Sequence, residues 1–380
     1  MINLLISAFE SLEYNDSDFI SLIEYLCNNP DPYQASLYHV LKNTAEGNPD
    51  SMNEWLFSLP PNYTGVIGWL AKVQYLQTER FVWMVGVIDD ETALVRDFIN
   101  NNWYKANANP LLACPRKPPF LLYLKPSAQS TWQQNLPQSN EEKIGDFSMF
   151  QVDYKGEKLR DDIDQLMAMN SIFLCNQVYQ IFEAMKMSCS EELLEYFEKN
   201  VLPKVGLLSK LHTELHNYGH FIGAFPYDNK TKNCDEYEAV EEYKACLVAI
   251  ELVSTLSDDL DLVNSFALLV VCTRIFGYGL RSYLVPEKTV QLVREISVGL
   301  FFFEQLKNNG VLKFDKKISI EIPSIRLSTK KLVQEIDASE AQAKENGNQI
   351  LVDYAVHLYS RSYPNKCLSP ELSKLYGMYT

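Results

Sequence analysis

The sequence predicts a mostly α-helical protein of the α+β class, with a helical C-terminal lobe that contains a small β-hairpin and a helical N-terminal region with one or two strands. Three observations predict this fold. Apolar residues recur at helical spacing over most of the second half of the chain. Six prolines interrupt the chain between residues 105 and 140. Isoleucines alternate with polar residues at Ile318, Ile320 and Ile322, as in a strand.

The first 100 residues are expected to be mainly helical. Asp16, Ser17 and Asp18 are suited to cap a helix over residues 19–27, because side-chain oxygens of these residue types accept hydrogen bonds from the first free backbone N–H groups. Pro32 favours the start of a second helix, which runs to residue 41. Asp89 and Asp90 are expected to cap a third helix that runs to residue 98.

The proline-rich stretch at 105–140 predicts the division between two domains, since proline breaks long helices. We expect an N-terminal, mainly helical region at 1–125 and a helical domain at 126–380. Residues 120–124 are typical of a strand, and residues 149–154 form either a second strand or the approach to a helix.

Beyond this point the chain is expected to be nearly all helix. The expected helices cover residues 157–187, 190–200, 204–223, 235–257, 259–284 and 287–307, and then 326–345 and 347–360. Gly310 ends the sixth of these helices, and residues 311–322 are expected to form the hairpin.

Charge and composition exclude several classes of partner. The 380 residues carry a formal net charge of −15, which disfavours nucleic acid and anionic membrane surfaces. The longest apolar run, at 266–272, is far shorter than a membrane span, and the first residues lack the basic segment of a signal peptide. The eight cysteines include no Cys-x-x-Cys pair. We therefore expect a cytoplasmic protein with no nucleic-acid or membrane partner.

Three of the five histidines, His212, His216 and His220, occur at intervals of four residues. On an α-helix this spacing places them on one face, where two imidazoles one turn apart can hold one metal ion. A further ligand must then come from elsewhere. The acidic helix that follows offers carboxylates at Glu238, Glu241 and Glu242.

The spacing of apolar residues along the acidic helix favours Glu242 as this ligand. The face through Glu242 continues with small and apolar residues, as expected for a face that packs on another helix. The face through Glu241 carries Lys244 and Glu251 and is expected to be more solvated. We therefore expect Glu241 to be a surface residue or one that supports the ligands. Gly219 is expected to let another backbone approach the histidine helix closely.

Two segments, LHNYGHFIG (215–223) and EEYKACLVAIEL (241–252), resemble the zinc-binding pair of the dipeptidyl peptidase III metallopeptidases and their shorter bacterial and plant relatives. In that family a His-Glu-x-x-His or His-Glu-x-x-x-His helix is followed by a helix of the type Glu-Glu-x-Lys/Arg-Ala-Asp/Glu. Segments 135–161 and 304–336 are also similar, so the resemblance covers roughly residues 130–360. It implies a zinc ion bound by His216, His220 and Glu242.

The chain departs from the family at the positions that perform catalysis. Asn217 stands where the family has the glutamate that acts as general base, and Cys246 stands where an acid orients a ligand histidine. The family also uses a downstream histidine, and here Arg274 and Arg281 are the cations near the corresponding stretch. His212 shares a face with the first ligand histidine, so it is a possible third nitrogen ligand or base. His212 and Asn217 are therefore the candidate catalytic residues.

These observations lead to three hypotheses for the function. The first is a divergent metal-dependent hydrolase that acts on a small molecule or peptide, with one zinc ion. The second is a mononuclear non-haem iron(II) oxygenase, because two histidines and one carboxylate with open positions also form that ligand set. The third is a catalytically inactive binding protein that keeps the peptidase fold.

Overall fold

The chain divides between two units. The first comprises Met1–Arg96 and Pro119–Leu174, and the second comprises Asp97–Pro118 and Cys175–Thr380. The computed structural model describes residues 66–75, 78–112, 120–126, 149–152, 166–223, 235–286, 290–347, 349–362 and 370–379. The expected domain boundary at 125/126 falls inside the first unit, and the helices expected at 19–27 and 32–41 lie outside the described residues.

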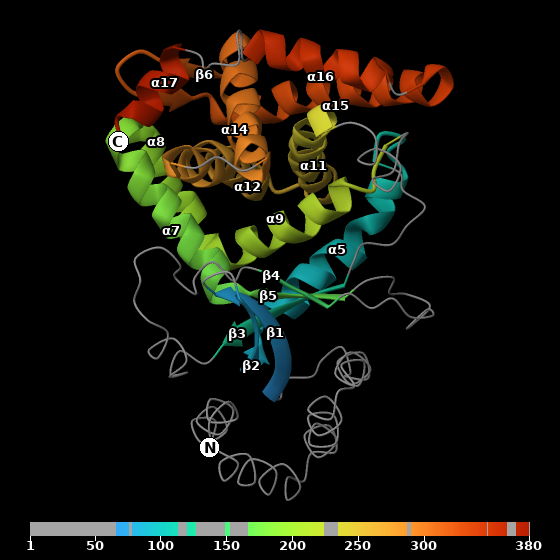
Figure 1. Cartoon of the computed structure of the whole chain (residues 1–380), viewed down its shortest axis with the longest axis vertical. Coiled ribbons are helices and arrows are strands. Elements are labelled where there is room, and N and C mark those ends of the chain that lie inside the picture. Colours follow the sequence, from blue (N-terminus) through green and yellow to red (C-terminus); the bar gives the residue numbers. More distant parts are fainter. Residues whose placement is uncertain are drawn as a thin grey trace, which may run out of the picture. The chain divides into compact units, whose positions relative to one another are not determined.

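A five-stranded sheet lies in the first unit (Figure 1). Its strands are β1 (Val66–Tyr75), β2 (Thr78–Ile88), β3 (Phe120–Pro126), β4 (Met149–Val152) and β5 (Leu166–Asn170). They are ordered β1-β2-β3-β5-β4. Antiparallel β1 and β2 pair along their whole length and are rich in the β-branched and aromatic residues that favour strands. β3 and β5 pair in parallel, so the sheet joins segments that are far apart in the sequence.

The strand expected at 120–124 is present as β3. Of the two alternatives for residues 149–154, a strand or the approach to a helix, the structure has the strand, as β4. Strands β1, β2 and β5 were not expected. In particular, β5 occupies residues within the helix expected at 157–187, and that helix begins only at Ser171. The helix expected after Asp89 is α5 (Glu91–Asn107), and the Asp89 side chain accepts a hydrogen bond from the Glu91 backbone N–H at 2.9 Å. Helix α5 continues nine residues past the end expected for it, residue 98.

From Ser171 onward the described chain is helical apart from one short hairpin, which confirms the expected mostly α-helical fold class with a small β-hairpin. The hairpin pairs β6 (Leu312–Phe314) with β7 (Ile318–Ile320). The α-helices are α7 (Ser171–Ser188), α8 (Glu191–Tyr196), α9 (Val205–Gly219), α11 (Asp235–Leu256), α12 (Leu260–Cys272), α13 (Leu280–Leu284), α14 (Val290–Asn308), α15 (Ile322–Asn346), α16 (Gln349–Ser362) and α17 (Pro370–Gly377). Helix α17 was not expected.

Helix α11 is the central helix of the second unit. It contacts α9, α12, α14, α15 and α16, and Figure 1 shows it between α9 and the pair α15 and α16. From residue 237 to residue 256 every residue is buried except Glu238, Glu242 and Thr255, which are half-buried. The helix therefore has no solvated face over this length, contrary to the expectation for the face through Glu241.

Gly219 sets the distance between α9 and α11. A Cβ atom at this position would lie 2.6 Å from the carbonyl oxygen of Ala245 and 2.8 Å from its Cα atom. Both atoms belong to the backbone of a buried helix, so neither can move aside cheaply. The expected close approach of a second backbone at Gly219 is therefore present, and the backbone concerned is that of α11.

We expect Gly219→Ala to lower the free energy of unfolding by about 1–3 kcal/mol, the usual cost of overpacking. This cost exceeds the gain of about 1 kcal/mol in helix propensity that alanine brings. Urea denaturation measures the change. Gly377→Ala in α17 is the matched control, because a Cβ atom there meets nothing within 4 Å. Equal stability of the two variants would contradict the tight contact.

A buried ion pair joins α11 to α15. The ammonium of Lys244 lies 2.8 Å from each carboxylate oxygen of Glu340, and the Tyr237 hydroxyl donates a hydrogen bond to Oε1 of Glu340 at 2.9 Å. The Lys244 ammonium also donates to the carbonyl of Ile222, just beyond α9. Lys244 and Glu340 are 1% and 0% exposed. Since both charges are satisfied by direct partners, the pair fixes α15 against the central helix.

The segment between α12 and α13 is a π-helix, η5 (Thr273–Gly279), which packs against α14 and is joined to α17 by a hydrogen bond. Gly279 and Gly299 of α14 approach closely, and a Cβ atom on Gly279 would lie 2.6 Å from the carbonyl oxygen of Arg274. The hydroxyl of Tyr376 in α17 donates a hydrogen bond to the carbonyl of Ile275 at 2.9 Å. Short π-helical turns within helices frequently occur at functional sites.

The continuous helical stretch Leu260–Leu284 is long and apolar enough to cross a membrane. However, 72% of its most apolar window is buried inside the protein, and the buried core helix of a globular protein has the same length and composition.

Candidate metal centre

The three candidate ligands predicted from the sequence lie together, on two helices. His216 and His220 belong to the last turn and the end of α9, and Glu242 belongs to α11. Each residue offers one donor atom, and the three atoms lie within 4.8 Å of one another. Nε2 of His216 is 3.3 Å from Oε2 of Glu242, and Nε2 of His220 is 3.8 Å from Oε1. The arrangement suits a single ion shared by two imidazoles and a carboxylate.

The packing at Gly219 explains why the three side chains meet. Gly219 lies between the two histidines in sequence and directly against Ala245, three residues after Glu242. Because the backbones touch there, Glu242 is held next to both imidazole rings. The side chains of His216, His220 and Glu242 are 14%, 13% and 17% exposed, so the centre is largely screened from solvent.

Glu241 lies behind His220. Its Oε1 is 3.5 Å from Nδ1 of His220, the ring nitrogen that does not face Glu242. This distance is longer than a good hydrogen bond but close enough for the carboxylate to favour one orientation of the ring. Glu241 is 1% exposed, so the expectation that it is a surface residue is wrong. The geometry favours the other expectation, that Glu241 supports a candidate ligand.

Arg274, from η5, makes polar contacts with four side chains of this region. Its Nη2 donates to Nε2 of His216 at 2.8 Å and lies 3.4 Å from Oε2 of Glu242. Its Nη1 donates to Oε2 of Glu295 at 2.8 Å, and its Nε donates to the sulfur of Cys246 at 3.0 Å. The arginine side chain is 5% exposed. These contacts satisfy most of the donors of a buried guanidinium.

The protonation states of His216 and Glu242 suit metal binding. Burial lowers the pKa of His216 to about 4, against the opposing effect of Glu242, so the imidazole is neutral at pH 7. Burial raises the pKa of Glu242, but His216, His220 and Arg274 together outweigh it and hold the pKa well below 4.5. Metal ions require neutral imidazole and ionised carboxylate, and both are present.

Two imidazoles and a carboxylate fit zinc or iron(II). However, Arg274 forms a hydrogen bond with one of the three ligand atoms, Nε2 of His216. Arginine can only donate, so Nε2 of His216 must accept from it with its single lone pair. The same lone pair cannot serve a metal ion at the same time. A metal at this centre therefore requires the guanidinium to withdraw from His216, while its bonds to Glu295 and Cys246 can remain.

Cys246 does not replace the acid that the family resemblance implies at this position. Burial raises the pKa of its thiol to about 12, so the sulfur is protonated and uncharged at pH 7. The sulfur accepts a hydrogen bond from Nε of Arg274. The carboxylate that lies behind the candidate ligand His220 is that of Glu241 instead.

The two candidate catalytic residues, His212 and Asn217, lie at different positions relative to His216. The His212 ring lies one turn before His216, with ring centroids 5.9 Å apart, and His212 is not part of the three-residue group. Its Nε2 is buried and has no hydrogen-bond partner among the described residues, and burial holds its pKa well below 6.5. Asn217 follows His216 directly and is half-buried.

Sequence reasoning named Arg274 only as a nearby cation and missed its contacts. A signal was available, because Arg274 is a charged residue inside Leu260–Leu284, the one helical stretch among the described residues that is long and apolar enough to cross a membrane. A buried arginine almost always has an anionic or strongly polar partner. Glu295, its closest carboxylate, is on α14 and could not be paired with it from spacing alone.

No protein-family model matches the chain, and a search of curated proteins finds no match either. The resemblance to the dipeptidyl peptidase III family therefore remains a hypothesis that rests on the residues quoted above.

Proposed function

We propose that this protein is a metal-dependent enzyme, a divergent hydrolase of the dipeptidyl peptidase III type that acts on a small molecule or peptide. One divalent ion, zinc, is held by His216, His220 and Glu242. The observation that carries the proposal is the convergence of these three donors from two helices, with both their spacing and the protonation states of His216 and Glu242 suited to an ion.

Zinc at this centre would act as a Lewis acid toward a carbonyl oxygen. The chain's own residues have separate parts in the reaction. Glu241 orients the ring of His220. The neutral, unpartnered Nε2 of His212 is the nearby proton acceptor, since the amide of Asn217 cannot take a proton. Arg274, once withdrawn from His216, supplies a positive charge for an anionic group of the substrate or for negative charge that develops in the reaction.

Elemental analysis of the purified protein tests the proposal. We expect about one zinc ion per chain, which is removed by a chelator and restored by added zinc. Iron in place of zinc would favour the oxygenase alternative, for which the same three ligands suffice. A metal-free protein that takes up no zinc or iron from a buffer containing them would contradict both.

The position of Arg274 favours a second candidate, the catalytically inactive binding protein. In that case the guanidinium serves as the permanent cation of the centre, held by Glu242 and Glu295. Arg274→Met distinguishes the two candidates, since it removes the competing cation but keeps much of the side-chain volume. Tighter zinc binding by the variant supports the metal centre, whereas no zinc binding by either form supports the permanent arginine.

Asn217→Glu tests the hydrolase part of the proposal. A glutamate there restores a proton acceptor next to the first ligand, and general-base catalysis contributes roughly 10²–10⁴-fold to rates. We expect the variant to hydrolyse di- and tripeptide arylamides faster than the parent protein by a factor in this range. Asn217→Gln is the matched control, because glutamine has the same side-chain length as glutamate but no carboxylate to accept a proton. Equal rates for the two variants would show that the centre differs from a peptidase in more than its base.

A further inference from the structure

The Arg274 guanidinium lies between two carboxylates, one of which is a candidate metal ligand and the other of which is not. Its Nη2 is 2.8 Å from Nε2 of His216 and 3.4 Å from Oε2 of Glu242. Its Nη1 donates to Oε2 of Glu295, on α14, at 2.8 Å. The arginine is therefore already bound through one nitrogen to a carboxylate outside the three candidate ligands.

Glu295 can accept a second hydrogen bond from the same arginine. Its Oε2 accepts from Nη1 of Arg274, whereas its Oε1 lies 3.7 Å from Nη2 of Arg294. That distance is too long for a hydrogen bond, so Oε1 can still accept one. A guanidinium can donate two parallel hydrogen bonds to one carboxylate, which is the strongest form of this pair. Glu295 therefore offers the guanidinium of Arg274 a second position.

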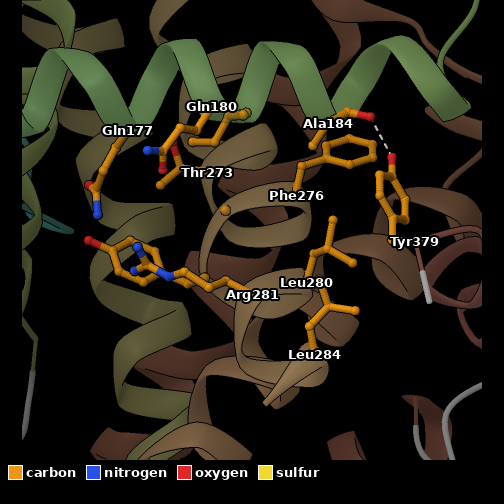
Figure 2. Close-up of a pocket in the computed structure, with 12 residues that line it drawn as sticks. Gln177, Gln180, Ala184, Thr273, Phe276, Leu280, Arg281, Leu284 and Tyr379 are labelled. Atoms are coloured by element: carbon orange, nitrogen blue, oxygen red, sulfur yellow. Dashed lines mark hydrogen bonds between the residues drawn. The ribbon is translucent and has the colours of Figure 1, made fainter. Parts of the chain in front are cut away.

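Tyr278 provides a surface on which the guanidinium can move between the two positions. The guanidinium carbon of Arg274 lies 5.0 Å from the centroid of the Tyr278 ring, within the range of a cation–π contact. The side chain of Gln177, on α7, hydrogen-bonds to Tyr278. Figure 2 shows Gln177 extending from α7 into a cavity of about 270 Å³ that Tyr278 also lines. The ring is thus held from α7 and can contact Arg274 in either position.

The charges of the region explain why a metal ion would move the arginine. Arginine does not lose its proton in proteins, so the guanidinium must leave His216 as a cation. A divalent ion held by His216 and Glu242 would lie next to it, and two cations in a largely buried site repel each other. The Arg274 side chain is 5% exposed, so it needs a carboxylate partner wherever it moves. Glu295 is such a partner.

We propose that Glu295 is a positioning residue for the candidate metal centre, which binds both Nη atoms of Arg274 when a metal ion enters. Metal binding is then an exchange of cations. The guanidinium leaves His216 for Glu295 as the ion arrives, and it returns to His216 and Glu242 when the ion leaves. The affinity for metal is therefore set by Glu295 as well as by the ligands. This inference rests on the proposed function, since it requires an ion at His216, His220 and Glu242.

Competitive titration of the full chain with zinc and a chelator tests the proposal. It compares the parent protein, Glu295→Gln, Arg274→Met and the double variant. We expect Glu295→Gln to weaken zinc binding by roughly 10–100-fold, the usual loss for a residue that supports metal ligands. A single amide oxygen cannot receive the guanidinium as a carboxylate does, so Arg274 competes more strongly for His216. In the Arg274→Met background the loss should be at least tenfold smaller, because no guanidinium remains to be held.

Glu238→Gln is the matched control for charge. It removes a carboxylate from α11, one turn before Glu242, where Glu238 lies 3.7 Å from Arg294. We expect a smaller loss of zinc affinity than in Glu295→Gln. An equal loss in these two variants, or an equal effect of Glu295→Gln with and without Arg274, would overturn the proposal but leave the metal centre standing. If neither the parent nor Arg274→Met binds zinc, the proposed function fails, and the role of Glu295 fails with it.

A crystal structure of the zinc-loaded parent protein is a second test, which needs no variant. We expect Nη1 and Nη2 of Arg274 within hydrogen-bond distance of the two carboxylate oxygens of Glu295, and Nε2 of His216 bound to the ion. A zinc-loaded protein in which Nη2 of Arg274 has moved to another partner would overturn the role of Glu295 while confirming the metal centre.

Discussion

Replacing His216 by alanine is expected to abolish stoichiometric metal binding. Loss of a residue that merely supports a metal ligand typically lowers affinity by 10–100-fold, so loss of a ligand should cost about 100-fold or more. Glu242→Gln should have a similar effect, because it keeps the shape of the side chain but removes its charge. Competitive titration with a chelator measures the affinity, and circular dichroism checks that each variant remains folded.

His212→Ala is the matched control for this experiment. It removes the same side chain from the same helix, one turn away from His216 and outside the three-residue group. We expect it to keep its metal. If the His216 or Glu242 variant still holds one metal ion per chain, the assignment of ligands is wrong. If His212→Ala alone loses the metal, His212 is the third nitrogen ligand that its sequence spacing suggested.

Lys244→Met is expected to destabilise the helical unit by about 3–5 kcal/mol, the usual cost of removing one partner from a buried ion pair. The substitution leaves the Glu340 carboxylate buried without the ammonium of Lys244, although the Tyr237 hydroxyl still donates a hydrogen bond to it. It also leaves the Ile222 carbonyl without this donor. Urea denaturation, followed by circular dichroism, gives the free energy of unfolding.

The double variant Lys244→Met with Glu340→Leu should recover much of this loss, since two apolar residues can replace a buried pair at little cost. Lys199→Met provides the contrast. Lys199 forms an exposed ion pair with Glu195 on the helix surface, and such pairs contribute little to stability because water screens them. A Lys244 variant no less stable than the Lys199 variant would contradict a structural role for the buried pair.

The grouping of the candidate ligands could be predicted from the sequence because it depends on helix geometry. Residues four apart share a face of a helix wherever that helix packs, so helical spacing alone makes His216 and His220 neighbours. The choice of Glu242 over Glu241 was reached from a wrong premise. Periodicity distinguishes faces only when one face is solvated, and α11 is buried all round, with Lys244 and Glu251 both inside. The histidines lie on the side of Glu242, but the pattern of the helix did not establish this.

The sheet and the contacts of Arg274 could not be predicted from local patterns. Strand β5 is a five-residue apolar segment, and such short segments read equally well as part of a helix. It is a strand here because it pairs with β3, more than forty residues earlier, and with β4. Likewise, Arg274 meets Cys246 and Glu295 only after three separate helical segments have packed together.

The hydrogen bond from Tyr376 to the carbonyl of Ile275 joins the last described helix to the backbone next to Arg274. Ile275 is the residue after Arg274, in the π-helical turn that aims the guanidinium at His216. Tyr376 and Gly299 also leave no room around the Arg274 carbonyl for a larger residue than glycine at 279. Helix α17 thus supports the backbone from which the Arg274 side chain extends, so we expect a substitution at Tyr376 to change the distance between the guanidinium and His216 without altering either residue.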